Sequence, residues 1–252
     1  MTDETRFKRL RLYNLVMGLF HLGQGIAIAA LSNDFKLPVT ATLMQGPPGT
    51  PPGVPTTLFE IPLGWAVATF VFLSALAHFI IASPLAFDWY VKNLRRQRNY
   101  ARWIEYSVSS TLMVILIGLL PGIFDIAAII GIAGANVSMI LFGLLMEHYE
   151  TPGTPNWMSY IFGCITGAVP WIAIAVYLWA PGQVAEPPAF VYWIFFSMFV
   201  FFMSFALNMV LQYKKIGPWK DYLFGEAAYI LLSLTAKSLL AWLVFANTLI
   251  PT

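Results

Sequence analysis

The stretch AAYILLSLTAKSLLAWLVFANTLI at residues 227–250 decides the fold of this chain, because it is apolar and long enough to cross a lipid bilayer as a helix. Lys237 is its only charged residue, and no other charge occurs between Glu226 and the C-terminus. A lysine at that depth is costly unless its ammonium group is paired or serves a function. In its neutral form the amine can also condense with a carbonyl. The sequence therefore predicts a partner or a ligand for Lys237.

The rest of the chain is similarly apolar. It has 252 residues, of which 59% are hydrophobic and 10% are charged, and its mean hydropathy is +0.72. Soluble domains are about half apolar and a quarter charged. The composition predicts one integral membrane domain over 1–252, made of helices. No zinc, P-loop or dinucleotide motif is visible in the sequence, so we expect no enzyme and no nucleic-acid partner. The single cysteine, Cys164, lies in an apolar run, so we expect it to be a small packing residue.

Seven segments are long and apolar enough for transmembrane helices, which predicts an all-α, seven-transmembrane-helix bundle. The expected spans are 11–31, 61–83, 100–120, 124–146, 157–180, 189–212 and 221–249. Proline and glycine residues separate them, for example at Pro121-Gly122 and Pro181-Gly182.

The distribution of basic residues predicts the topology. Twelve of the fourteen Lys and Arg residues fall on one face if the helices alternate: Arg6, Lys8, Arg9, Arg11, Lys92, Arg95, Arg96, Arg98, Arg102, Lys214, Lys215 and Lys220. Cytoplasmic loops carry such an excess. We therefore expect a protein of the cell membrane with a cytoplasmic N-terminus and an extracellular C-terminus. Basic residues before an apolar run also resemble a signal peptide. Asn14, His21 and Gln24 within that run favour a retained first helix.

The first external loop, residues 32–60, is the longest connection. Residues 37–42 alternate as a strand does, and proline-rich turns follow them. One interpretation is a small β-hairpin that lies over the bundle or on a neighbouring subunit. The other is a mobile linker.

Glu105 is the candidate partner for Lys237. At 1.5 Å per residue, the Lys237 nitrogen would lie about 16 Å deep and Glu105 about 13 Å deep on the cytoplasmic side. The two can therefore meet. The alternative is an interfacial carboxylate paired with Arg102 or Arg98.

Small polar residues at helical spacing can serve this pair. Ser233 lies one turn before Lys237, and Ser109 lies one turn after Glu105, so both hydroxyls can bond to it. The alternative for each is a bond to its own helix backbone. Asn136 is a further candidate.

Two histidines lie in the first two spans. His21 and His78 both fall in the cytoplasmic half or near mid-membrane, where they could take up a proton released from the Lys237–Glu105 pair. The alternative is a pair of histidines satisfied by water or backbone. No third ligand lies at a suitable spacing, so we expect no metal site.

Seven spans, a lysine in the middle of the last span and a carboxylate on the third resemble the microbial rhodopsins. The motifs Arg102-Trp-Ile-Glu-Tyr-Ser-Val-Ser-Ser110 and Ser233-Leu-Thr-Ala-Lys-Ser238, the two histidines, the long first loop and the topology resemble the heliorhodopsin family. The resemblance implies all-trans retinal on Lys237 as a protonated Schiff base, with Glu105 as its counterion. It also implies Ser233 and Ser109 beside that pair, a proton-accepting cavity with His21 and His78, and a homodimer that involves the first loop.

Departures from the proton-pumping rhodopsins favour a photoreceptor. Those proteins usually carry an aspartate one turn before the lysine, where this chain has Ser233, and a second carboxylate where this chain has Leu116. We therefore expect a light sensor that signals to an unknown cytoplasmic or membrane partner. The first alternative is a light-driven ion pump or a light-gated proton conductance. The second is a seven-helix carrier that does not respond to light.

Overall fold

The computed structural model describes residues 2–180 and 186–250, so Pro181 and Gly182 lie outside the described residues. The fold is mostly helical, as expected. The elements are α1 Asp3–Leu31, β1 Lys36–Ala41, β2 Thr56–Pro62, α2 Leu63–Ala82, α3 Phe87–Leu94, α4 Tyr100–Leu119, α5 Ile126–Tyr149, α6 Met158–Trp179, α7 Ala189–Tyr213, a 3-10 helix η1 Gly217–Lys220, α8 Tyr222–Val244 and a π-helical turn η2 Phe245–Leu249.

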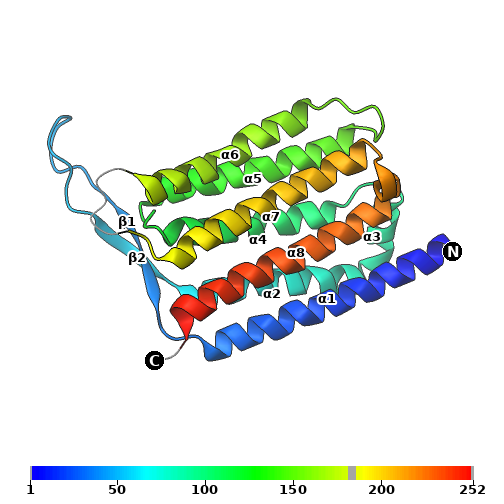
Figure 1. Ribbon diagram of the computed structural model, residues 1–252, viewed down its shortest axis with the longest axis horizontal. Helices are drawn as coiled ribbons and strands as arrows, with labels where there is room; N and C mark the ends of the chain where they lie inside the picture. The colour runs from blue at the N-terminus through cyan, green and yellow to red at the C-terminus, as the bar shows by residue number, and fades with distance from the viewer. Residues whose placement is uncertain (1, 181–185, 251–252) are drawn as a thin grey trace.

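The long helices lie side by side in a bundle (Figure 1). The helix α1 packs on α2, α2 packs on α4, and α4 packs on α5, which in turn packs on α6. The helix α8 contacts α7, α1 and α2. The N-terminus, α3 and the α7–α8 connection lie at one end of the bundle, whereas the strands and the C-terminus lie at the other (Figure 1). The three basic segments of the chain are therefore gathered at the end that carries the N-terminus.

Six helices of the described chain are long and apolar enough to cross a membrane: α1, α2, α5, α6, α7 and α8 with η2. The helix α4 is not one of the six, although α4 and α2 are both 20 residues long. Its first half carries Arg102, Glu105 and several hydroxyl residues, which lower its hydropathy. That polar half meets buried groups of the neighbouring helices rather than an apolar surrounding.

Two helical features differ from the expected spans. The helix α1 begins at Asp3 rather than at residue 11, because the side chain of Thr2 accepts a hydrogen bond from the amide of Thr5 and caps the helix. The helix α3 was not expected, since it is too short and too charged to span a membrane. It is amphipathic and buries Tyr90 and Leu94 against the bundle.

The long loop between α1 and α2 forms a two-stranded antiparallel sheet, which is consistent with the expected hairpin. Lys36 pairs with Pro62 and Ala41 with Thr56, and the register shifts between Val39 and Thr40. The amide of Thr40 donates to the carbonyl of Phe124 at 2.8 Å, and this bond fastens the sheet to the segment before α5.

The helices α1 and α8 are tied together at both ends. At the end with the N-terminus, Arg6 forms an ion pair with Asp221, the N-cap of α8. At the other end, the side-chain amide of Asn33 donates to the carbonyls of Thr248 at 3.0 Å and Ile250 at 3.3 Å. These contacts hold α8, which carries Lys237, to the first helix.

The junction between α1 and α2 predicts an effect on stability. A Cβ atom at Gly64 would lie 2.5 Å from the Cβ of Ser32, which follows α1. We therefore expect Gly64→Ala to lower the free energy of unfolding by about 1–3 kcal/mol through overpacking. Chemical denaturation of the detergent-solubilised protein measures this change.

Gly131→Ala is the matched control. Nothing lies within 4 Å of a Cβ at Gly131 inside α5, so this change should be neutral or stabilise the helix by up to about 1 kcal/mol. Equal losses in both variants would contradict the close junction.

Candidate functional site

The site is centred on Lys237 of α8 and Glu105 of α4. The Nζ atom of Lys237 donates to Oε1 of Glu105 at 2.8 Å, and the two side chains are 3% and 10% exposed. Lys237 Nζ also lies 5.3 Å from the ring centroid of Tyr106. The depth argument from the sequence predicted that these two charges meet, and the structure brings them together.

Serine hydroxyls surround this pair. Ser233, one turn before Lys237, accepts a hydrogen bond from Nζ at 2.9 Å. Ser74 of α2 donates to Oε1 of Glu105 at 2.6 Å. Ser109 is buried beside the carboxylate of Glu105, but its hydroxyl makes no hydrogen bond of ordinary geometry to a described residue. The pair thus has hydroxyls from three helices around it.

Asn136 lies apart from the pair. Its side-chain amide donates to Ser110 and to Thr111, both at 2.9 Å, and so joins α5 to α4. No hydrogen bond among the described residues connects Asn136 to Lys237 or Glu105 directly.

The two histidines stack on each other, with ring centroids 5.6 Å apart and planes 17° apart. The Nδ1 atom of His78 lies 2.8 Å from Oδ1 of Asn14, a hydrogen bond between α2 and α1. Neither ring nitrogen of His21 has a partner among the described residues. No group of three or more His, Cys, Asp or Glu residues in the described chain could hold a metal ion.

A second buried charge cluster lies nearer the end with the N-terminus. Arg102 donates to Glu147 at 2.5 Å and lies 3.2 Å from Glu226. Its guanidinium carbon is 3.8 Å from the ring centroid of Tyr229 and 4.5 Å from that of Trp103. Arg102 therefore does not pair with Glu105, which was the alternative considered from the sequence.

A small polar chamber of about 40 Å³ joins the two clusters. Its lining includes Glu105, His78, Asn14, Tyr90, Arg102 and Glu226. A volume of this size holds one or a few water molecules. The hydroxyl of Tyr90 has no hydrogen-bond partner of ordinary geometry among the described residues. The chamber thus extends the polar surroundings of the Lys237–Glu105 pair toward Arg102.

A large apolar cavity begins on the other side of Lys237. Its volume is about 440 Å³, within the range of small-molecule sites. Aromatic side chains contribute a large part of its wall, among them Trp103, Tyr106, Trp171, Phe199, Phe202 and Phe205. Cys164 of α6 and Met203 and Leu207 of α7 also line it and are exposed, so the cavity reaches the outer surface of the bundle.

Glycine makes room for one wall of this cavity. A Cβ atom at Gly143 of α5 would lie 2.5 Å from the ring of Trp103, and one at Gly167 of α6 would collide with Met139. The absence of side chains lets Trp103 and Met139 pack at the cavity wall.

Sequence reasoning did not assign four residues to the site. Ser74 and Asn14 were the only small polar groups in their turns, and that signal could have selected them. Glu147 and Glu226 lie near helix ends, where a carboxylate is ordinarily solvated. Their burial against Arg102 depends on tertiary packing that the sequence pattern does not show.

Removing one partner of the Lys237–Glu105 pair should destabilise the protein. Lys237→Ala leaves a buried carboxylate without its cation, which costs about 3–5 kcal/mol. Adding Glu105→Gln should recover a large part of that loss. Denaturant titrations in detergent, without added ligand, measure the free energy of unfolding of the wild type and both variants. A double variant that is no more stable than Lys237→Ala would show that packing dominates.

The comparisons with known proteins agree with this geometry. The family model described as heliorhodopsin matches residues 10–249. No curated protein matches the chain. Among solved structures, the light-driven proton pump LR (Mac) from Leptosphaeria maculans is 17% identical with a TM-score of 0.68, and the match covers 98% of this chain and 95% of that one. The light-driven proton pump CsR from Coccomyxa subellipsoidea is 17% identical with a TM-score of 0.59, over 93% of this chain and 96% of that one.

Cyanorhodopsin N2098R from Calothrix sp. NIES-2098 is 14% identical with a TM-score of 0.61, over 98% of this chain and 95% of that one. At identities this low, the structural matches establish the shared rhodopsin fold alone. The family match, in contrast, spans nearly the whole chain. The chain therefore belongs to the heliorhodopsin family, whose members are light-responsive membrane proteins with covalently bound retinal.

Proposed function

We propose that this protein is a photoreceptor that binds all-trans retinal on Lys237 as a protonated Schiff base. The observation that carries the proposal is the position of the Lys237 amine, which meets an aromatic cavity of about 440 Å³ on one side and a buried carboxylate on the other. A long apolar aldehyde needs an apolar wall and an amine at its end, and the protonated Schiff base that they form needs an anion beyond the amine.

The residues present fit this cofactor. The aromatic wall formed by Trp103, Trp171 and Phe202 matches a conjugated apolar chain, and Lys237 lines the same cavity. When bound, retinal supplies the absorption of visible light and an isomerisation that displaces its attachment point. Glu105 holds the proton on the lysine nitrogen, and Ser74 and Ser233 orient the pair through hydrogen bonds.

His21 and His78 are proposed to receive the proton when the pair weakens. His78 lines the same chamber as Glu105, and its bond to Asn14 orients the ring. His21 stacks on it with two unpartnered nitrogens, so this histidine can accept a proton without breaking a hydrogen bond among the described residues. Ser109 and Asn136 are proposed to support α4 beside the pair.

The proposed topology has seven spans, with α4 as the third, a cytoplasmic N-terminus and an extracellular C-terminus. The placement of α4 between α2 and α5 supports its role as a span, because its polar half faces buried partners. The gathering of the basic segments at the end with the N-terminus supports the orientation.

Signalling is favoured over pumping because the other buried charged side chains of the described residues, Arg102, Glu147 and Glu226, lie between the pair and the end with the N-terminus. Toward the strands, the bundle is filled by a hydrophobic cluster that includes Leu116, Ile117, Leu240 and Val244. A proton relay across a membrane needs polar groups on both sides of its centre. The protein is proposed to signal to a cytoplasmic or membrane partner and to form a homodimer through β1 and β2, whose outer face exposes Leu58 and Phe59.

The absorption spectrum tests the cofactor assignment. Purified protein with retinal should show a visible band that Lys237→Ala abolishes. Glu105→Gln should move the band markedly to longer wavelength, because the carboxylate stabilises the ground state, in which the positive charge lies at the nitrogen.

Glu60→Gln is the matched control, since Glu60 is an exposed carboxylate on β2 paired with Lys36. Its spectrum should equal that of the wild type. A visible band that survives Lys237→Ala would contradict the attachment of retinal to Lys237. An unchanged spectrum in Glu105→Gln would contradict the role of Glu105 as counterion.

Illumination of cells that contain the protein tests signalling against transport. We expect no sustained light-induced change in external pH, because the hydrophobic cluster beyond Lys237 interrupts the polar route. The measurement compares illuminated suspensions with and without a protonophore. A robust pH change or photocurrent that the protonophore abolishes would establish the pump or conductance instead.

A further inference from the structure

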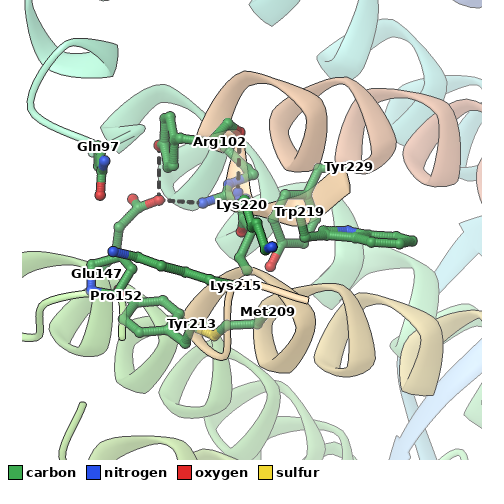
Figure 2. A pocket seen from close by; sticks show the side chains of 12 residues that line it. Gln97, Arg102, Glu147, Pro152, Met209, Tyr213, Lys215, Trp219, Lys220 and Tyr229 are labelled. Carbon is green, nitrogen blue, oxygen red and sulfur yellow. Dashed lines mark hydrogen bonds and ion pairs between the residues drawn. The ribbon is translucent and has the colours of Figure 1, made fainter. Parts of the chain in front are cut away.

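A second pocket opens at the end of the bundle that carries the N-terminus. Figure 2 shows the side chains of Lys215 and Lys220 directed toward Arg102 and Glu147. The pocket lies where the segments after α3 and α7 meet the ends of α4, α5 and α8. Its volume of about 20 Å³ has room for one or two oxygen atoms of a ligand whose remainder lies outside the pocket.

The charges that line this pocket favour an anion. Arg102, Lys215 and Lys220 contribute three cations, and Glu147 contributes one carboxylate. Both oxygens of Glu147 already accept hydrogen bonds: one from the amide of Asn99 and the Trp103 indole, the other from Arg102 and the Tyr222 hydroxyl. Neither Lys215 nor Lys220 has an ion-pair partner in the described part of the chain.

Arg102 itself is incompletely bonded. Its side chain is 5% exposed and lines the pocket, yet Nε has no hydrogen-bond partner among the described residues. Nη1 lies at ion-pair distance from Glu226 without hydrogen-bond geometry. A buried donor without an acceptor is costly. An oxygen acceptor in this pocket would supply what Arg102 lacks.

The backbone gives an independent indication. Among residues 2–180 and 186–250, the only non-glycine residues with positive φ are Gln97 at 57° and Lys215 at 52°. Both follow a helix end, where glycine ordinarily takes this conformation at lower cost. Both side chains line the same pocket. Strained residues cluster at functional sites, so these two positions mark the pocket as a candidate site.

We infer that this pocket binds an oxyanion, a carboxylate or a phosphate, between Lys215, Lys220 and Arg102. Arg102 also lines the chamber that reaches Glu105. An anion bound here therefore acts on a residue that lines the same chamber as Glu105. On the proposed topology the pocket faces the cytoplasm. The binding of the anion does not depend on the proposed function. The coupling rests on the proposed function, because it assumes that Lys237 carries retinal.

The test uses the full-length protein with retinal in detergent, titrated with inorganic phosphate or acetate against chloride at constant ionic strength. Line broadening of the ³¹P or ¹³C resonance reports binding in the dark. We expect saturable broadening by wild type for at least one oxyanion, and affinity weakened about tenfold in Lys215→Gly and in Lys220→Gln. A response to acetate alone identifies a carboxylate site, and a response to phosphate identifies a phosphate site.

Lys214→Gln is the matched control, because Lys214 faces the Trp157 ring and does not line the pocket. Its affinity should equal that of wild type. The thermal midpoint of Lys215→Gly should not fall below wild type, since glycine relieves the strained backbone; this excludes misfolding as the cause of weakened binding. No saturable broadening, full affinity in Lys215→Gly, or an equal loss in Lys214→Gln would overturn the site.

The visible band tests the coupling separately. Added oxyanion should shift the band of wild type, and Lys215→Gly should need about tenfold more oxyanion for the same shift. Binding without any shift would refute the coupling and leave the site standing. Absence of binding with a normal visible band would refute the site and leave the photoreceptor proposal intact.

Discussion

The buried pair of Lys237 and Glu105 is the interaction on which the rest of the structure depends. A buried ion pair is tolerated only when its geometry is good and additional hydrogen bonds satisfy the remaining polar atoms. Here Ser233 and Ser74 supply those bonds from α8 and α2. The requirement sets the axial position of α8 against α4, because a shift of one residue in either helix would separate the charges. The bundle therefore has one register in which its central charge is satisfied.

The pair is one of two buried charge clusters arranged in series. The second holds one cation, Arg102, between the carboxylates of Glu147 and Glu226, and two aromatic rings flank the guanidinium. Such a network is expensive to bury and is sensitive to any change in charge. The small chamber between the clusters allows water to connect them. An electrostatic change at one cluster therefore alters the field at the other, which suits a light-responsive membrane protein.

Much of this arrangement follows from the sequence. Apolar runs of sufficient length predicted the long helices, and the depth of Lys237 and Glu105 along their helices predicted that they meet. Both inferences use distances along a helix, which depend on geometry that every helix shares. The alternation at residues 37–42 likewise matches the strand at Lys36–Ala41. These features are local or follow from helical rise.

The features that escaped prediction depend on which surfaces of different helices meet. The short helix α3 has no hydropathy signal, and its burial of Tyr90 appears only when the bundle is assembled. Glu147 and Glu226 lie far apart in sequence, and only packing around Arg102 brings them together. The same holds for Ser74, whose distance from Glu105 depends on how α2 and α4 are rotated. A sequence pattern specifies which residues are polar, but not which of them share a partner.

The ties between α1 and α8 limit how the protein can move. A helix fastened to the same neighbour at both ends cannot tilt or slide alone, because either motion would break the contacts of Asp221 or of Asn33. The helices α6 and α7 are also joined twice: the Tyr160 hydroxyl donates to the carbonyl of Ala206, and the Tyr192 hydroxyl donates to the carbonyl of Leu178. The bundle therefore holds two fastened helix pairs, α1 with α8 and α6 with α7, and the cavity beside Lys237 is lined by a helix of each pair. A displacement that starts at Lys237 changes the width of this cavity between the two pairs rather than the tilt of a single helix.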